Sequence, residues 1–185
     1  MKRGILIIAV LIVGLPLLVR GQELVIIPRD QIVEGNLVRS GDRVDLDGTV
    51  KGDAILFGSA MTVNGTVEGD LIAIGQSLVV KGEVRGSIRA AATEIRLEGP
   101  VGRNVTIAGS QVTVASGADV QGSVAAPAQT LRVGGAVRGS VDATAADITV
   151  SGNVGESAVL RNDIPFLSSG GRTTVTEAAV IGGGL

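Results

Sequence analysis

The sequence predicts an all-β protein, a single-stranded parallel β-solenoid with 17-residue coils. Three observations predict it: apolar columns recur at a 17-residue spacing, apolar and polar residues alternate within each coil, and glycine returns at a fixed place. The segments 44–58 and 61–75, VDLDGTVKGDAILFG and MTVNGTVEGDLIAIG, show the repeat directly. Short strands separated by bends at a fixed spacing are typical of a polygonal coil of strands.

The columns stay in step along most of the chain. The valine column consists of Val33, Val50, Val67, Val84, Val101, Val120, Val137 and Val154. Two further apolar columns begin at Val44 and Leu46, and a glycine column begins at Gly48. The step lengthens by two residues once, near 115–119, where we expect an outward bulge at a corner.

Residues 1–21 have the layout of a secretory signal peptide. Lys2 and Arg3 precede an apolar run at 4–19, and Val19 and Gly21 suit the −3 and −1 positions of a cleavage site. An uncleaved membrane anchor is the alternative, although the run is shorter than the roughly 20 residues that usually span a bilayer. Either interpretation predicts export, to the periplasm or the cell surface.

The rest of the chain divides into three parts. We expect an extended segment at 22–31, a solenoid of about eight coils and roughly 40 Å at 32–160, and a loop with an irregular last coil or cap at 161–185. The composition agrees with a narrow core: hydrophobic residues make up 45% of the chain, yet Phe57 and Phe166 are its only aromatic residues.

The outward columns carry a second signal. Glu34, Lys51, Glu68 and Arg85 alternate in charge, and Lys81 is expected to lie over Glu98. Another column holds short polar side chains that can hydrogen-bond nearby backbone at a bend. Its members are Asn36, Asp53, Asp70, Ser87, Asn104, Ser123, Ser140 and Ser157.

No pattern of catalytic or ligand-binding residues stands out, and we expect no enzyme activity and no cofactor. The chain has no histidine and no cysteine, so the usual general base, nucleophile pairs and thiolate ligands are missing. Stacked Asp53 and Asp70 could in principle act as a glycosidase pair, and Asp42, Asp45, Asp47 and Asp53 could bind calcium; we favour a structural role for both sets. Neither a phosphate-binding glycine loop nor a basic stripe is present, so we expect no nucleotide and no nucleic acid as partner.

Four large apolar residues occupy outward positions of two neighbouring coils: Ile55, Phe57, Ile72 and Ile74. One interpretation is that the segment Leu24–Ile27 folds over them. The other is a lateral contact with another molecule or a membrane, because exposed apolar patches often mark interaction sites.

The recurring element G-x-V-x-G-[DNS]-[LIV], as in Gly65-Thr66-Val67-Glu68-Gly69-Asp70-Leu71, resembles the bactofilins, a family of bacterial polymer-forming cytoskeletal proteins. The resemblance covers about Ile32 to Val159. It implies a right-handed, three-sided β-helix that assembles end to end into nucleotide-free filaments, which scaffold membrane-associated or wall-modifying machinery. The export signal departs from the cytoplasmic location of familiar bactofilins, and the part after Leu160 does not match their pattern.

These observations predict an exported structural protein whose main partner is itself. Chains would stack head to tail through the terminal coils, at Ile32 and Val33 on one end and Val150 and Val154 on the other. Components of the membrane or cell envelope are further candidate partners. The alternative function is an envelope-associated adhesin or ligand-binding solenoid that remains monomeric.

Overall fold

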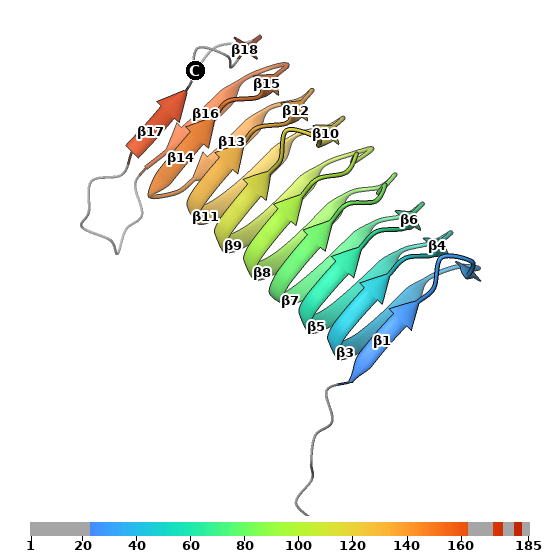
Figure 1. The fold of residues 1–185 in the computed structure, drawn as a ribbon. Helices are drawn as coiled ribbons and strands as arrows, with labels where there is room; N and C mark the ends of the chain where they lie inside the picture. Colours follow the sequence, from blue (N-terminus) through green and yellow to red (C-terminus); the bar gives the residue numbers. More distant parts are fainter. Residues whose placement is uncertain (1–22, 163–171, 176–179, 183–185) are drawn as a thin grey trace, which may run out of the picture.

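The computed structural model describes residues 23–162, 172–175 and 180–182, and the predicted signal peptide at 1–21 lies outside them. It confirms the predicted fold class: parallel strands stack in coils of about 17 residues, for about eight turns. Figure 1 shows the coils stacked along one axis, with β1 at one end and β17 and β18 at the other. Within the described ranges, no helix is long and apolar enough to cross a membrane.

Three kinds of strand build the stack. Strands of ten residues are β3 (Leu37–Leu46), β5 (Ala54–Val63), β7 (Leu71–Val80), β8 (Ile88–Leu97), β9 (Val105–Val114) and β11 (Val124–Val133). Strands of four residues are β1 (Leu24–Ile27), β13 (Val141–Thr144), β14 (Asp147–Val150), β16 (Ala158–Arg161) and β17 (Arg172–Val175). Strands of two residues are β2 (Ile32–Val33), β4 (Thr49–Val50), β6 (Thr66–Val67), β10 (Asp119–Val120), β12 (Ala136–Val137), β15 (Asn153–Val154) and β18 (Val180–Ile181).

Each coil has three sides. In β5, the side chains of Ala54 and Leu56 point inward, and so do those of Met61 and Val63, so the alternation changes phase at Gly58. The chain therefore bends in the middle of each long strand. We call its first half side 1, its second half side 2, and the short strand that follows side 3. The three-sided coil agrees with what the resemblance implied.

Side chains of the same column lie directly above one another. Leu37 pairs with Ala54, and Ala54 pairs in turn with Leu71, one coil further along the chain. The expected bulge is confirmed: Val101 pairs with Val120, and the additional residues form a turn in which the Ala118 N–H donates to the Ala115 carbonyl at 2.9 Å. Ser116 and Gly117, in that turn, are exposed.

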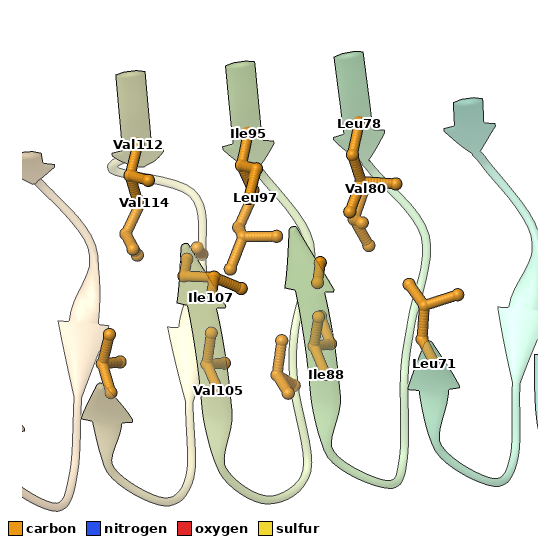
Figure 2. Packing of buried hydrophobic residues seen from close by; sticks show 14 of the residues in the cluster. Leu71, Leu78, Val80, Ile88, Ile95, Leu97, Val105, Ile107, Val112 and Val114 are labelled. Atoms are coloured by element: carbon orange, nitrogen blue, oxygen red, sulfur yellow. The ribbon is translucent and has the colours of Figure 1, made fainter. Parts of the chain in front are cut away.

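The core is a narrow apolar column inside the three sides. It is built almost entirely from Val, Leu, Ile and Ala, most of them less than 3% exposed. Figure 2 shows Leu71, Ile88 and Val105 on one side, facing Leu78, Ile95 and Val112 on the next. Small and branched side chains fill this space without aromatic rings, which explains the composition.

The N-terminal boundary predicted from the sequence is wrong. Residues Leu24–Ile27 are not an extended segment outside the solenoid: they form the first rung of side 2 and pair with Arg43–Leu46. Ile27 is 2% exposed and belongs to the core. The prediction that this segment folds over Ile55 and its neighbours is therefore also wrong, because pairing along the free edge of β3 places the segment elsewhere.

At the C-terminal end, the described residues within 161–185 form the irregular last coil that the sequence offered as an alternative to a cap. Strand β17 pairs with β14, and β18 pairs with β15, so the described residues after Arg161 continue the stack by one more coil. Val150 pairs with Val175, and Val154 with Ile181. The prediction that Val150 and Val154 form the C-terminal edge is wrong, because a further coil covers both. This last coil is irregular because Asp147 pairs with Arg172, well beyond the 17-residue step.

The glycine column predicts where the fold tolerates substitution. A Cβ on Gly82 would lie 1.8 Å from the Gly65 carbonyl oxygen, whereas one on Gly117 would meet nothing closer than 3.3 Å. We expect Gly82→Ala to lower the free energy of unfolding by more than about 3 kcal/mol, because backbone would have to move. Gly117→Ala is the control, and we expect it to change stability by less than about 0.5 kcal/mol. Chemical denaturation of both variants measures this; equal losses would contradict the stacking argument.

Candidate functional site: the polar ladder, the two ends and the outer faces

A ladder of side-chain hydrogen bonds runs along the corner between side 3 and side 1. The Asn36 Oδ1 accepts from the Asp53 N–H at 2.9 Å, the Asp53 Oδ1 from the Asp70 N–H at 2.8 Å, and the Asp70 Oδ1 from the Ser87 N–H at 2.8 Å. The ladder resumes at Asn104, whose Oδ1 accepts from Ser123. The predicted role of this column, bonding backbone at a bend, is confirmed, and the bonds join successive coils.

The residue before each ladder position explains the Gly-Asp element of the repeat. A Cβ on Gly69 would lie 2.3 Å from the Asp53 Oδ1, and one on Gly86 would lie 2.4 Å from the Asp70 Oδ1. Glycine is thus needed because the ladder side chain of the preceding coil occupies that space. Where Arg103 replaces glycine, the step from Ser87 to Asn104 has no ladder bond among these described residues.

Asp70 is the most strongly held member of the ladder. Its Oδ1 accepts from the Ser87 N–H, and its Oδ2 lies 2.6 Å from Arg89 Nη1. The Ser87 backbone bond, and then the Arg89 bond, lower the pKa of this carboxyl below its ordinary value. A proton-donating role for Asp70 is therefore unfavourable, and a pairing role in the fold accounts for both oxygens.

The charged outward columns follow the predicted stacking in part. Lys51 Nζ lies 2.7 Å from Glu34, and Arg85 Nη1 lies 3.1 Å from Glu68. The Glu34 hydrogen bond and charge raise the pKa of Lys51. The expected contact of Lys81 with Glu98 is replaced by an Arg96–Glu98 ion pair within one coil, at 2.5 Å. Exposed pairs of this kind contribute little to stability but disfavour wrong registers.

No metal-binding arrangement occurs among the described residues, which contain no group of three or more His, Cys, Asp or Glu placed to hold an ion. The carboxylates considered for calcium are instead dispersed. Asp42 accepts from the Glu23 N–H, Asp45 pairs with Arg43, and Asp47 accepts from the Asn64 side-chain amide.

All three sides end in a strand edge at both ends of the described stack. At the N-terminal end these edges are β1, β2 and the side-1 half of β3; at the C-terminal end they are β16, β17 and β18. Predicted residues Ile32 and Val33 do lie at the N-terminal end, in β2, where Ile32 is 59% exposed and Val33 is half-buried. Edges of this kind can pair with another chain.

The ends also carry polar residues in columns that are apolar elsewhere. Arg39 aligns with the buried Leu56, but its own side chain is exposed and its Nη1 donates to the Val38 carbonyl at 2.8 Å. At the other end Thr173 aligns with the buried Ile148, and its hydroxyl bonds the Asn162 side chain. Neither residue was predicted from the sequence as a functional residue, although each breaks an apolar column.

The four predicted patch residues lie together on the outside of side 1, as expected. Ile55 pairs with Ile72, and Phe57 with Ile74, in adjacent strands β5 and β7. Val38 extends the same column in β3. Val38, Phe57 and Ile74 are 55%, 39% and 51% exposed. We refer to these five residues as the side-1 patch.

Comparison of the chain with protein-family models, curated proteins and solved structures found no match.

The ladder predicts a specific effect of Asp70 variants. Asp70→Ala leaves the Ser87 N–H without its acceptor, and we expect a loss of about 1–3 kcal/mol in unfolding free energy. Asp70→Asn keeps an acceptor and should lose less. Because the folded-state pKa of Asp70 is lowered, its contribution is present above the ordinary carboxyl pKa and is lost as pH falls through the lower folded-state value. Denaturation curves between neutral and acidic pH should therefore converge for wild type and Asp70→Asn; a constant gap would contradict this.

Proposed function

We propose that this chain is an exported structural protein that assembles end to end through its terminal coils. The observation that carries the proposal is the presence of strand edges on all three sides at both ends of the described stack. Inside the stack, each coil bonds the coils before and after it, as in the bonds from Thr66 N to Gly48 O and from Val67 N to Glu83 O. A second chain placed on either end could continue the same bonding.

The resemblance to the bactofilins supports the same proposal. It rests on the G-x-V-x-G-[DNS]-[LIV] element, and the structure gives that element a physical reason in the ladder and its glycines. A family scaffold carried outside the cytoplasm by residues 1–21 would serve the periplasm or the cell surface. The charge-paired outer columns of side 3 suit a face of the rod that stays in contact with solvent.

A second candidate function is a monomeric envelope-associated adhesin or ligand-binding module. The observation that favours it is the polar character of both ends, since Arg39 and Thr173 stand in inward columns. Charged residues pointing inward at an edge are a known means of preventing edge pairing. In this function the outer faces, and not the ends, would bind the partner.

Val33→Lys tests the proposed assembly. Val33 is the inward residue of β2 at the N-terminal end, so a charged side chain there would be buried in a junction but stays near solvent in a single chain. We expect filaments of the mature protein in electron microscopy and high-speed sedimentation, and their loss in the variant. Thr62→Lys, on the outer surface of side 2, is the matched control and should assemble normally. A monodisperse monomer at all concentrations of wild type would support the second candidate function instead.

Arg39→Leu tests the role of the polar end. In an in-register junction the guanidinium of Arg39 would be buried next to Leu56, which costs several kcal/mol unless a partner neutralises it. We expect Arg39→Leu to lower the concentration needed for assembly at least tenfold, measured by light scattering across a dilution series. Arg132→Leu, outward on side 2, is the control. Weaker assembly of Arg39→Leu would mean that Arg39 instead makes a favourable contact in the junction.

A further inference from the structure

The outer surface of side 1 is the face of the rod with the fewest charges. One of its two outward columns is Val38, Ile55, Ile72, Arg89, Thr106, Ala125, Asp142 and Val159. The other is Ser40, Phe57, Ile74, Ala91, Ala108, Pro127, Thr144 and Arg161. By contrast, the outer surfaces of sides 2 and 3 carry the Arg43–Asp45, Lys51–Glu34 and Arg138–Asp119 pairs.

The few charges in these two columns are neutralised locally. Arg89 lies 2.6 Å from Asp70, and Arg161 lies 2.5 Å from Asp142 in the preceding coil. The face therefore offers a partner little net charge. It offers instead the side-1 patch at its N-terminal end, followed by small residues such as Ala91 and Ala108.

We propose that the side-1 face binds the same face of a second copy of this chain, so that the filaments of the proposed function associate side by side. A pleated parallel sheet presents rungs about 4.8 Å apart, and two such sheets pack face to face at about 10 Å when apolar side chains interdigitate. A second copy offers the same spacing and the same apolar surface. Phe57 and Ile74 project from neighbouring rungs and are placed to enter such a contact.

The border of the patch argues against a lipid surface as the partner. Amphipathic surfaces that bind anionic membranes carry Lys and Arg around their apolar residues. Here Asp53 and Asp70 precede the side-1 segments of β5 and β7, and Asp42 follows that of β3. Within these three segments the one basic residue is Arg39, whose Nη1 donates to the Val38 carbonyl. Arg89, the basic residue next to Ile72 in its column, is already paired with Asp70.

The size of the patch makes the contact dependent on end-to-end assembly. Three rungs about 4.8 Å apart and four residues of about 3.3 Å each enclose an area on the order of 200 Å². A stable pair of proteins usually buries about 800 Å² on each partner. Single chains should consequently pair only weakly, whereas filaments repeat the contact at every subunit and gain avidity.

Cysteine cross-linking tests the contact separately from the filament. The chain has no cysteine, so Ile74→Cys and Val79→Cys each introduce one thiol on β7, the first on the side-1 face and the second outward on side 2. A short bismaleimide is added to each variant, in the otherwise native mature chain and together with Val33→Lys. Thermal unfolding checks that all variants are folded, and electron microscopy records filaments.

We expect Ile74→Cys to give at least tenfold more cross-linked dimer than Val79→Cys in assembled protein, and this excess to fall sharply in the Val33→Lys background. Equal yields from the two cysteines would overturn the lateral contact, whatever the microscope shows. Absence of filaments in wild type would overturn the end-to-end proposal. The lateral contact would then still be decided by the ratio of cross-linked dimer from Ile74→Cys to that from Val79→Cys at high protein concentration. If Ile74→Cys gives more cross-linked dimer than Val79→Cys only when phosphatidylglycerol vesicles are added, the side-1 face binds lipid, and the proposed contact between copies is overturned.

Discussion

Hydrogen bonding between successive coils is the constraint on which the whole structure depends. A coil of this length cannot satisfy its own backbone, and it closes no core by itself. Stacking solves both problems at once. Each strand pairs with a strand one coil away, and the inward apolar side chains of successive coils pack into one continuous core. The stack tolerates the two extra residues because the turn at 115–118 places them at a corner, where no apolar column is interrupted.

The same constraint decides which residues can occupy the corners. Backbone of neighbouring coils approaches so closely that a Cβ at Gly65 or Gly82 would overlap a carbonyl oxygen of the coil before it. At the ladder corner, the space above each glycine is taken by an Asp, Asn or Ser side chain that accepts the next backbone N–H. The ladder hydrogen bond therefore requires both the polar side chain in one coil and the glycine in the next. Where Arg103 stands in place of the glycine, the bond is missing at that step.

Stacking satisfies the backbone hydrogen bonds and closes the core inside the rod. It leaves strand edges unpaired at the ends of the described stack and does not determine the contacts of the outer faces. The ends combine strand edges with polar residues in inward columns, so a junction would be weaker than an interior step. On the outer faces, ion pairs join successive coils on side 3 and lie within a coil on side 2, whereas side 1 retains apolar residues near its N-terminal end.

The sequence by itself determined the repeat, the parallel solenoid, the inward columns and the ladder, because the spatial neighbour of a side chain lies one coil away and each column can be followed in the letters. It also placed Ile55, Phe57, Ile72 and Ile74 on the outside, because inward and outward positions alternate along a strand. Only the tertiary structure decided where the stack begins and ends. Leu24–Ile27 and Arg172–Val175 belong to terminal coils that depart from the regular step, so the columns in the sequence give neither their partner strands nor their register. Pairing along the free strand edges places them there, and that pairing left the side-1 patch uncovered by the segment expected to shield it.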